Sequence, residues 1–213
     1  MSNIKLVHSG GNSVSLTTPT SNPSSNITFK LPQADGTAGQ VLQTDGNGNL
    51  TFVDAPFSVY DKGVGATTTT GNQNPFTSWV RHDATKSPLL GTGMSHSSGT
   101  FTFPKTGVYL VRFNADMYNT SSAERTIDCD IMFTTNNSSY SLLQNSSGNV
   151  HEVGGYNIHS TVQVQAMLDV TSTSNVKVQF KITAYNNAST LNAQGYGAAG
   201  GYTYVDFTRV ADT

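Results

Sequence analysis

The 213-residue chain is poor in charge, with 11% charged residues and a formal net charge of −2. That balance leaves no basic stripe, so we expect neither nucleic acid nor an anionic membrane surface as a partner. Serine, threonine, asparagine and glycine are abundant and helix-forming residues are scarce, which favours strands and turns. The composition therefore predicts an all-β protein.

The chain contains one cysteine, Cys129, so no internal disulfide framework is possible. Met1 leads into polar sequence without the apolar core of a secretory signal, and no stretch approaches a transmembrane span. We expect synthesis in a reducing compartment. Stability must then come from packing or from assembly.

Residues 1–55 form the first of two predicted regions. Their apolar residues are sparse and come in strand-sized groups separated by glycine, proline and asparagine. Such a segment cannot bury a core alone. Val14 and Leu16, and then Ile27, Phe29 and Leu31, nevertheless alternate as in strands, which favours order over disorder. We predict an extended, β-rich attachment segment completed by other copies of itself or by a larger scaffold.

Residues 56–213 form the second region, in which apolar and polar residues alternate over residues 107–118, 127–133, 158–170 and 176–182. Turn-forming runs lie at residues 136–139 and 171–175. A period of two with one apolar face is typical of antiparallel sheets. We predict an antiparallel β-sandwich, for which jelly-roll topology is a natural option.

Residues 98–110 read Ser98-Gly99-Thr100-Phe101-Thr102-Phe103-Pro104-Lys105-Thr106-Gly107-Val108-Tyr109-Leu110. A strand would end at Pro104, a turn needs Gly107, and a central strand would begin with a buried aromatic. This run resembles the signature G-x-F-x-x-P-x-x-G-x-Y-x-F of C1q and tumour-necrosis-factor-like domains. Residues 55–59 (Ala-Pro-Phe-Ser-Val) resemble their opening strand, and residues 202–210 their closing strand. The resemblance implies a C1q-like jelly-roll head over about 57–213, with structural positions at Phe57, Phe101, Phe103, Pro104, Gly107, Tyr109 and Phe207.

C1q-like heads are generally homotrimers, so the resemblance implies a homotrimer in which part of each inner sheet faces a threefold axis. The chain departs from the family before the penultimate strand, where "aGD-x-V" is often found. Residues 169–176 instead hold a Ser/Thr turn. A ligand or ion role of that hairpin is therefore not carried over.

Residues 29–53, from Phe29-Lys30-Leu31-Pro32 to Leu50-Thr51-Phe52-Val53, carry a second resemblance. They look like a segment of phage and prophage fibre or virion proteins that commonly precedes a distal domain. The resemblance implies that residues 1–55 attach the head to other virion proteins.

Two acidic groups are candidate cation sites. Asp45-Gly46-Asn47-Gly48-Asn49 is similar to the first half of an EF-hand loop, but Leu50 and Pro56 stand where glycine and glutamate are needed, so we predict a hairpin turn. Asp128 and Asp130 project from one strand face. They could share a calcium ion with a neighbouring loop or subunit, and the alternative is a solvated face. Near a threefold axis, these like charges would need a cation or Arg125.

The pairs His82-Asp83, Ser95-His96 and His151-Glu152 are fragments of a hydrolase site, but nothing completes them. Residues 93–97 lack the closing glycine of G-x-S-x-G, and no histidine pair has zinc spacing. Cys129 alternates with apolar neighbours and is predicted to lie in the core. We expect no catalytic residue and no cofactor.

Residues 185–202 form an unusual segment in which glycine stands beside tyrosine. Flat amphipathic side chains on a flexible backbone suit recognition of a sugar or a protein. The candidate receptor residues are Tyr185, Asn186, Asn187, Tyr196 and Tyr202. The alternative is a long surface loop, or one packed along a trimer axis.

The leading hypothesis is a structural and adhesive virion protein, a trimeric phage tail fibre or knob that binds a glycan or protein of the host surface. A capsid decoration or head-fibre protein is the alternative, and location on the particle separates the two. A capsule-degrading enzyme is less favoured, because it needs paired carboxylates in a groove.

Overall fold

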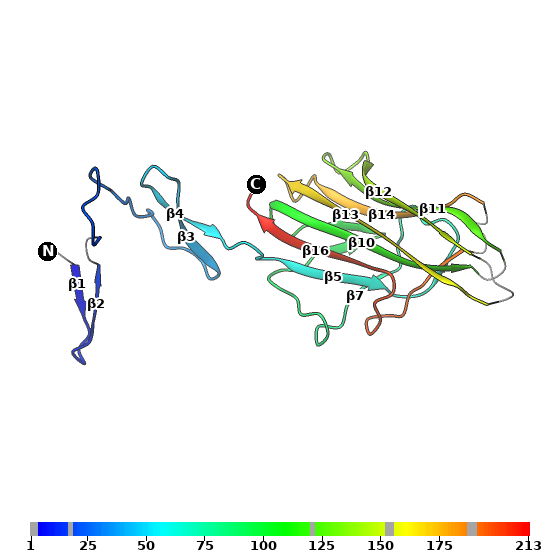
Figure 1. The fold of residues 1–213 in the computed structure, drawn as a ribbon, viewed down its shortest axis with the longest axis horizontal. Coiled ribbons are helices and arrows are strands. Elements are labelled where there is room, and N and C mark those ends of the chain that lie inside the picture. The colour runs from blue at the N-terminus through cyan, green and yellow to red at the C-terminus, as the bar shows by residue number, and fades with distance from the viewer. Residues whose placement is uncertain (1–3, 17–18, 120–121, 152–155, 187–190) are drawn as a thin grey trace. The chain divides into compact units, whose positions relative to one another are not determined.

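The computed structural model describes residues 4–16, 19–119, 122–151, 156–186 and 191–213 (Figure 1). Within those ranges the chain forms strands and turns and no helix. These residues therefore contain no helix that is long and apolar enough to cross a membrane. The chain divides into two compact units, Met1–Val53 and Asp54–Thr213. We call them the N-terminal segment and the head.

The N-terminal segment contains two separate hairpins. Strand β1 (Ile4–Val7) pairs with β2 (Ser13–Leu16), and β3 (Gln40–Thr44) pairs with β4 (Leu50–Asp54). An isolated two-stranded hairpin is marginally stable in water. None of the segment's described side chains is buried. Seven of its apolar side chains are at least 62% exposed, namely Ile4, Leu6, Val7, Leu16, Ile27, Phe29 and Leu31. As the sequence predicts, this segment has no core of its own.

The turn between β3 and β4 is the hairpin predicted at residues 45–49. The Asp45 carboxylate accepts the backbone N–H groups of Asn47 and Asn49 and the Asn49 side-chain amide. These hydrogen bonds lower the pKa of Asp45. Gly46 and Gly48 have φ angles of 79° and 87°, the left-handed region that glycine adopts without strain.

The head is a sandwich of two antiparallel sheets, as predicted (Figure 1). The seven-stranded sheet contains β5 (Tyr60–Gly65), β6 (Thr69–Thr70), β7 (Trp79–Arg81), β10 (Gly107–Asn119), β13 (His159–Val170), β15 (Leu191–Ala193) and β16 (Tyr204–Ala211). The five-stranded sheet contains β8 (Ser95–Ser97), β9 (Thr100–Thr102), β11 (Glu124–Thr134), β12 (Ser141–Val150) and β14 (Lys177–Ala184).

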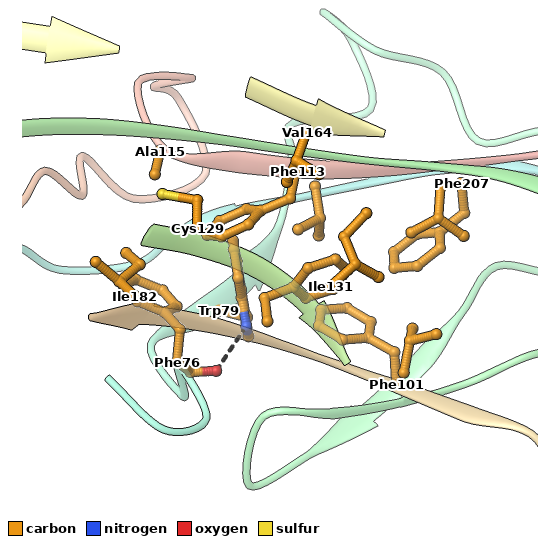
Figure 2. Packing of buried hydrophobic residues seen from close by; sticks show 14 of the residues in the cluster. Phe76, Trp79, Phe101, Phe113, Ala115, Cys129, Ile131, Val164, Ile182 and Phe207 are labelled. Atoms are coloured by element: carbon orange, nitrogen blue, oxygen red, sulfur yellow. Dashed lines mark hydrogen bonds between the residues drawn. The ribbon is translucent and has the colours of Figure 1, made fainter. Parts of the chain in front are cut away.

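The core lies between the two sheets and is centred on Trp79 (Figure 2). The centroid of the Trp79 ring lies 4.5–6.2 Å from the ring centroids of Phe76, Phe101, Phe113 and Phe180. These rings come from both sheets and from the loop before β7, and the indole N–H donates to the Phe76 carbonyl at 2.9 Å. Cys129 is fully buried in the same cluster, and burial raises the pKa of its thiol. The alternation predicted for the four long segments is confirmed.

The signature run folds around Arg209, which is only 2% exposed. Its guanidinium donates to the Thr106 carbonyl and to the Ser58 hydroxyl. Gly107 has a φ of +135°, and a Cβ there would lie 2.5 Å from the Arg209 Nε. Only glycine leaves room for this buried cation beside the backbone.

The aromatic residues of the signature lie in the core. Phe103 packs on Tyr109 at 4.7 Å, and the Tyr109 hydroxyl donates to the Lys105 carbonyl at 3.0 Å. Burial raises the pKa of Tyr109 to about 12. Phe101 and Phe207 are also buried, with ring centroids 5.1 Å apart, and Pro104 lies in the bend that follows β9.

Phe57 departs from the expected opening strand. It lies in a turn with a φ of 59° and is 58% exposed, and the strand begins at Tyr60 instead. Pro56 has no N–H to donate to a sheet, and a positive φ at Phe57 turns the backbone out of the extended form. Val59 is the residue of that run that enters the core.

Replacing Phe113 by alanine removes a fully buried ring that packs on Trp79 and Phe180. We expect the free energy of unfolding to fall by about 3–5 kcal/mol, measured by urea denaturation with the fluorescence of the single tryptophan as the signal. Asn149→Ala, at an exposed position of β12, is the control and should change it by less than about 0.5 kcal/mol. Equal midpoints for Phe113→Ala and wild type would contradict this account of the core.

Candidate functional site

The two ends of the head differ in the chain segments that lie there (Figure 1). At the near end the chain enters at Asp54, whose carboxylate lies 3.0 Å from the Lys105 ammonium, and the C-terminus lies at this end as well. At the far end lie the last residues of β10, β12 and β14 and the first residues of β11, β13 and β15. Exposed loops at the end away from the chain's entry are the natural place for a binding surface.

The candidate residues Tyr185 and Asn186 follow β14 at the far end. Their backbone N–H groups donate to the Glu124 carboxylate at 3.2 and 2.9 Å, and Glu124 is fully buried. The Tyr185 hydroxyl donates to Asp128 at 2.7 Å, and this hydrogen bond raises the pKa of Tyr185. A buried carboxylate thus fixes the backbone here while the tyrosine side chain stays 62% exposed.

Tyr196 and Tyr202 lie together in the connection between β15 and β16, two strands of the seven-stranded sheet. Their rings meet edge to face with centroids 5.9 Å apart, and they are 67% and 48% exposed. Asn114 donates its side-chain amide to the Tyr202 carbonyl at 2.8 Å. A Cβ at Gly195 would lie 2.3 Å from the Thr67 backbone, so glycine is needed for this close approach.

Residues 185–202 are therefore not one continuous loop. The strand β15 lies within them, is buried, and pairs with β10 and β6. It separates the Tyr196–Tyr202 pair from Tyr185 and Asn186, while Asn187 lies outside the described residues. The sequence hid this strand because Leu191-Asn192-Ala193 is too short to show a period of two.

Two further aromatic residues of the far end were not predicted. Tyr156 is 77% exposed in the connection between β12 and β13. Tyr118 packs on His159 with ring centroids 5.0 Å apart, and the His159 Nδ1 lies 2.7 Å from Asp116. Tyr118 and His159 are brought together by the pairing of β10 with β13, for which the sequence carries no local signal.

Asp128 and Asp130 project from the five-stranded sheet as predicted. Asp128 accepts from the hydroxyls of Ser147 and Tyr185, while Asp130 lies 3.5 Å from the Lys181 ammonium. Burial raises the pKa of Asp130. Lys181, rather than Arg125, is thus the cation that faces this carboxylate. In the ranges that the structure describes, no group of three His, Cys, Asp or Glu side chains could hold a metal ion.

The three histidine fragments lie in different surroundings. Burial lowers the pKa of His82, while the neighbouring Asp83 accepts from Thr85. His96 is exposed on β8 and packs on Phe101 at 5.2 Å, and His151 is exposed after β12. The absence of a catalytic residue stays a prediction.

The outer face of the seven-stranded sheet carries a row of charges. The Arg112 Nε donates to Asp206 at 2.8 Å, and the Lys62 ammonium lies 4.1 Å from the centre of the Tyr204 ring. The Asp206 side chain is 4% exposed, and burial raises its pKa against the opposing effect of Arg112. Next to this row stand Leu110 and Met167, which are directly opposite each other in the sheet, with Met167 54% exposed.

No family model matches the sequence, and no curated protein matches it. Among solved structures, Eiger TNF from S. frugiperda is 15% identical, with a TM-score of 0.54 over 75% of this chain and 96% of that one. Murine APRIL at pH 5.0 is 12% identical, with a TM-score of 0.50 over 71% of this chain and 98% of that one. The chain has a TNF-like jelly-roll fold. At these identities the similarity establishes the fold of the TNF-like head and leaves its function open.

Asp206→Asn tests the charged row. Because burial raises the pKa of Asp206 above 3.8, the folded head binds this proton more tightly than the unfolded chain does, and wild type loses stability as pH rises through that range. The asparagine has no such proton. We therefore expect the free energy of unfolding of wild type to fall relative to that of the variant as pH rises from about 4 to about 7. Urea denaturation at each pH measures both. A rise in the unfolding free energy of wild type relative to the variant over this pH range would contradict the burial of this charge.

Proposed function

We propose that the chain is a structural and adhesive protein of a bacteriophage particle, a trimeric tail fibre or knob whose far-end loops bind the host surface. The observation that carries the proposal is the gathering of tyrosines at the far end of the head, away from the point where the chain enters. Tyr156 and Tyr185 lie there, 77% and 62% exposed, and Tyr196 and Tyr202 form a second exposed pair in the connection between β15 and β16. The likeness of residues 29–53 to phage fibre segments supports the viral context.

Exposed tyrosines suit adhesion for a physical reason. Each offers a large flat surface and one hydroxyl while ordering few torsions, so a sugar or protein can be bound at a low cost in entropy. The hydrogen bonds from Tyr185 and Asn186 to Glu124, and from Asn114 to Tyr202, hold the surrounding backbone in place before binding. Preorganisation of this kind raises affinity without adding contacts.

The homotrimer that the C1q/TNF resemblance implies fits the unpartnered apolar surface of one copy. Met167 is 54% exposed on the outer face of the seven-stranded sheet, and Leu110 lies beside it. A threefold interface over this face would bury them. Three copies would present three equivalent sets of loops, so weak binding at each is multiplied by avidity.

The N-terminal segment is proposed to join the head to other virion proteins. Its hairpins expose apolar side chains that a single chain leaves in water, including Leu6, Phe29 and Leu31. Burying them against sibling copies or a scaffold releases roughly 25 cal/mol for each Å² of apolar surface. Attachment and ordering of this segment would then be one event.

The test is binding of the labelled full chain to cells that the particle infects. Tyr156→Ser alters an exposed far-end tyrosine and Tyr196→Ser an exposed tyrosine of the β15–β16 connection, and together they should lower cell binding at least about tenfold. Tyr140→Ser, in the near-end turn between β11 and β12, is the matched control and should bind like wild type. Unchanged binding by the double variant, or no binding by wild type, would refute adhesion through the far end.

A further inference from the structure

The β3–β4 hairpin of the N-terminal segment carries a short addition beside β4. The Lys30 N–H donates to the Gly48 carbonyl at 2.8 Å, and the Leu50 N–H donates to the Lys30 carbonyl at 2.9 Å. These two hydrogen bonds make an isolated parallel bridge between Lys30 and Asn49. Strand β4 therefore lies between residues 29–31 and β3. We call this unit, residues 29–31 with β3 and β4, the bridged hairpin.

Gly48 allows this close approach of two backbones. It has a φ of 87°, and a Cβ there would lie 2.3 Å from the Thr28 carbonyl oxygen. Any other residue would push residues 28–30 away from β4, because a Cβ and a backbone oxygen cannot come so close. A glycine at this position therefore serves the bridge as well as the turn.

The bridged hairpin has one polar side and one apolar side. Bridge partners share a side, so Lys30 and Asn49 lie on the same one. Side chains alternate along extended backbone, which puts Phe29, Leu31 and Phe52 on the opposite side. They are 65%, 76% and 39% exposed. Three large apolar side chains thus meet water on one side of a small sheet, and we call them the apolar face.

The apolar face is too small to hold a separate partner by itself. The exposed parts of its three side chains amount to roughly 300 Å². A stable interface between separate proteins buries about 800 Å² on each partner. Contact over the apolar face therefore needs a partner that is already held nearby, which a freely diffusing scaffold protein is not.

Sibling copies meet this requirement through the head. Strand β4 ends at Asp54, where the head begins, and the Asp54 carboxylate lies 3.0 Å from the Lys105 ammonium of the head. The bridged hairpin is thus joined to the head without an intervening linker. In a homotrimer of heads, three bridged hairpins would be tethered at an effective concentration in the millimolar range. A contact that is too weak for free proteins can form under that condition.

We propose that the apolar faces of three sibling copies pack against one another, so that the bridged hairpins form a closed β stalk. Its core is Phe29, Leu31 and Phe52 from each chain, while Lys30 and Asn49 face water. This inference rests on the homotrimer of the proposed function and names the partner that this part of the N-terminal segment uses. The polar side of the stalk and the β1–β2 hairpin then remain for contact with other virion proteins.

The experiment is hydrogen exchange of the purified full chain, measured by mass spectrometry of peptides from residues 26–53, with the solution mass determined on the same samples. A small sheet with one apolar side in water is marginal, so its amides would exchange nearly like those of an unfolded peptide. Packed on sibling copies, they should exchange at least about tenfold more slowly, and the mass should be that of three chains.

Phe29→Ser combined with Leu31→Ser removes most of the apolar face, while the heads still hold three chains together. The peptides should then lose their protection from exchange at an unchanged solution mass. Lys30→Ser combined with Thr51→Ser is the matched control, because it places two substitutions at exposed positions on the polar side. This control should keep the protection.

Fast exchange in a wild-type chain of trimeric mass would overturn the stalk and leave the homotrimer standing. Protection that survives Phe29→Ser with Leu31→Ser would overturn it as well, because the apolar face would then not be what packs. A solution mass of one chain would refute the homotrimer itself, and the stalk with it.

Discussion

Burial of one aromatic cluster between two sheets is the interaction on which the head depends. Trp79 lies on the short edge strand β7, yet its ring reaches Phe113 in one sheet and both Phe101 and Phe180 in the other (Figure 2). Its indole N–H is satisfied by the Phe76 carbonyl, so a polar group enters the core without an unpaired donor. With the sheets held together in this way, the loops at their ends are free to vary and to carry function.

The N-terminal segment obeys the same physics with the opposite result. Two hairpins without a second layer leave their apolar side chains in water, as Leu16 and Leu31 illustrate at 71% and 76% exposure. On the proposed function, such a segment would gain its stability from association. The contrast between a head with its own core and a segment without one fits the proposed attachment role, in which assembly and presentation would be separated along one chain.

The sequence predicted the elements whose pattern is local. Strands β10, β11, β13 and β14 each bury one face, so a period of two was enough to find them. Strand β12 escaped prediction because its burial is slight and its residues are mostly polar, as suits an edge strand. The reason for glycine at position 107 could not be predicted either, since its neighbour Arg209 is distant in the sequence.

The candidate site was predicted in part. Tyr185, Tyr196 and Tyr202 are exposed, as glycine-rich surroundings suggested, but β15 divides them into two places. Glu124 meets Tyr185 and Asn186 only because β11 pairs with β14, and the Arg81–Asp61 ion pair likewise joins β7 to β5. Contacts of this kind follow from topology, and no short motif encodes them.

Association of the chain with itself is the central claim, and its solution mass tests that claim most directly. Sedimentation equilibrium of the purified full chain at micromolar concentration should give three times the chain mass of 22.6 kDa. A mass of one chain at every concentration would contradict the account, because the exposed apolar residues of the N-terminal segment and the outer sheet face would then have no sibling copies to cover them.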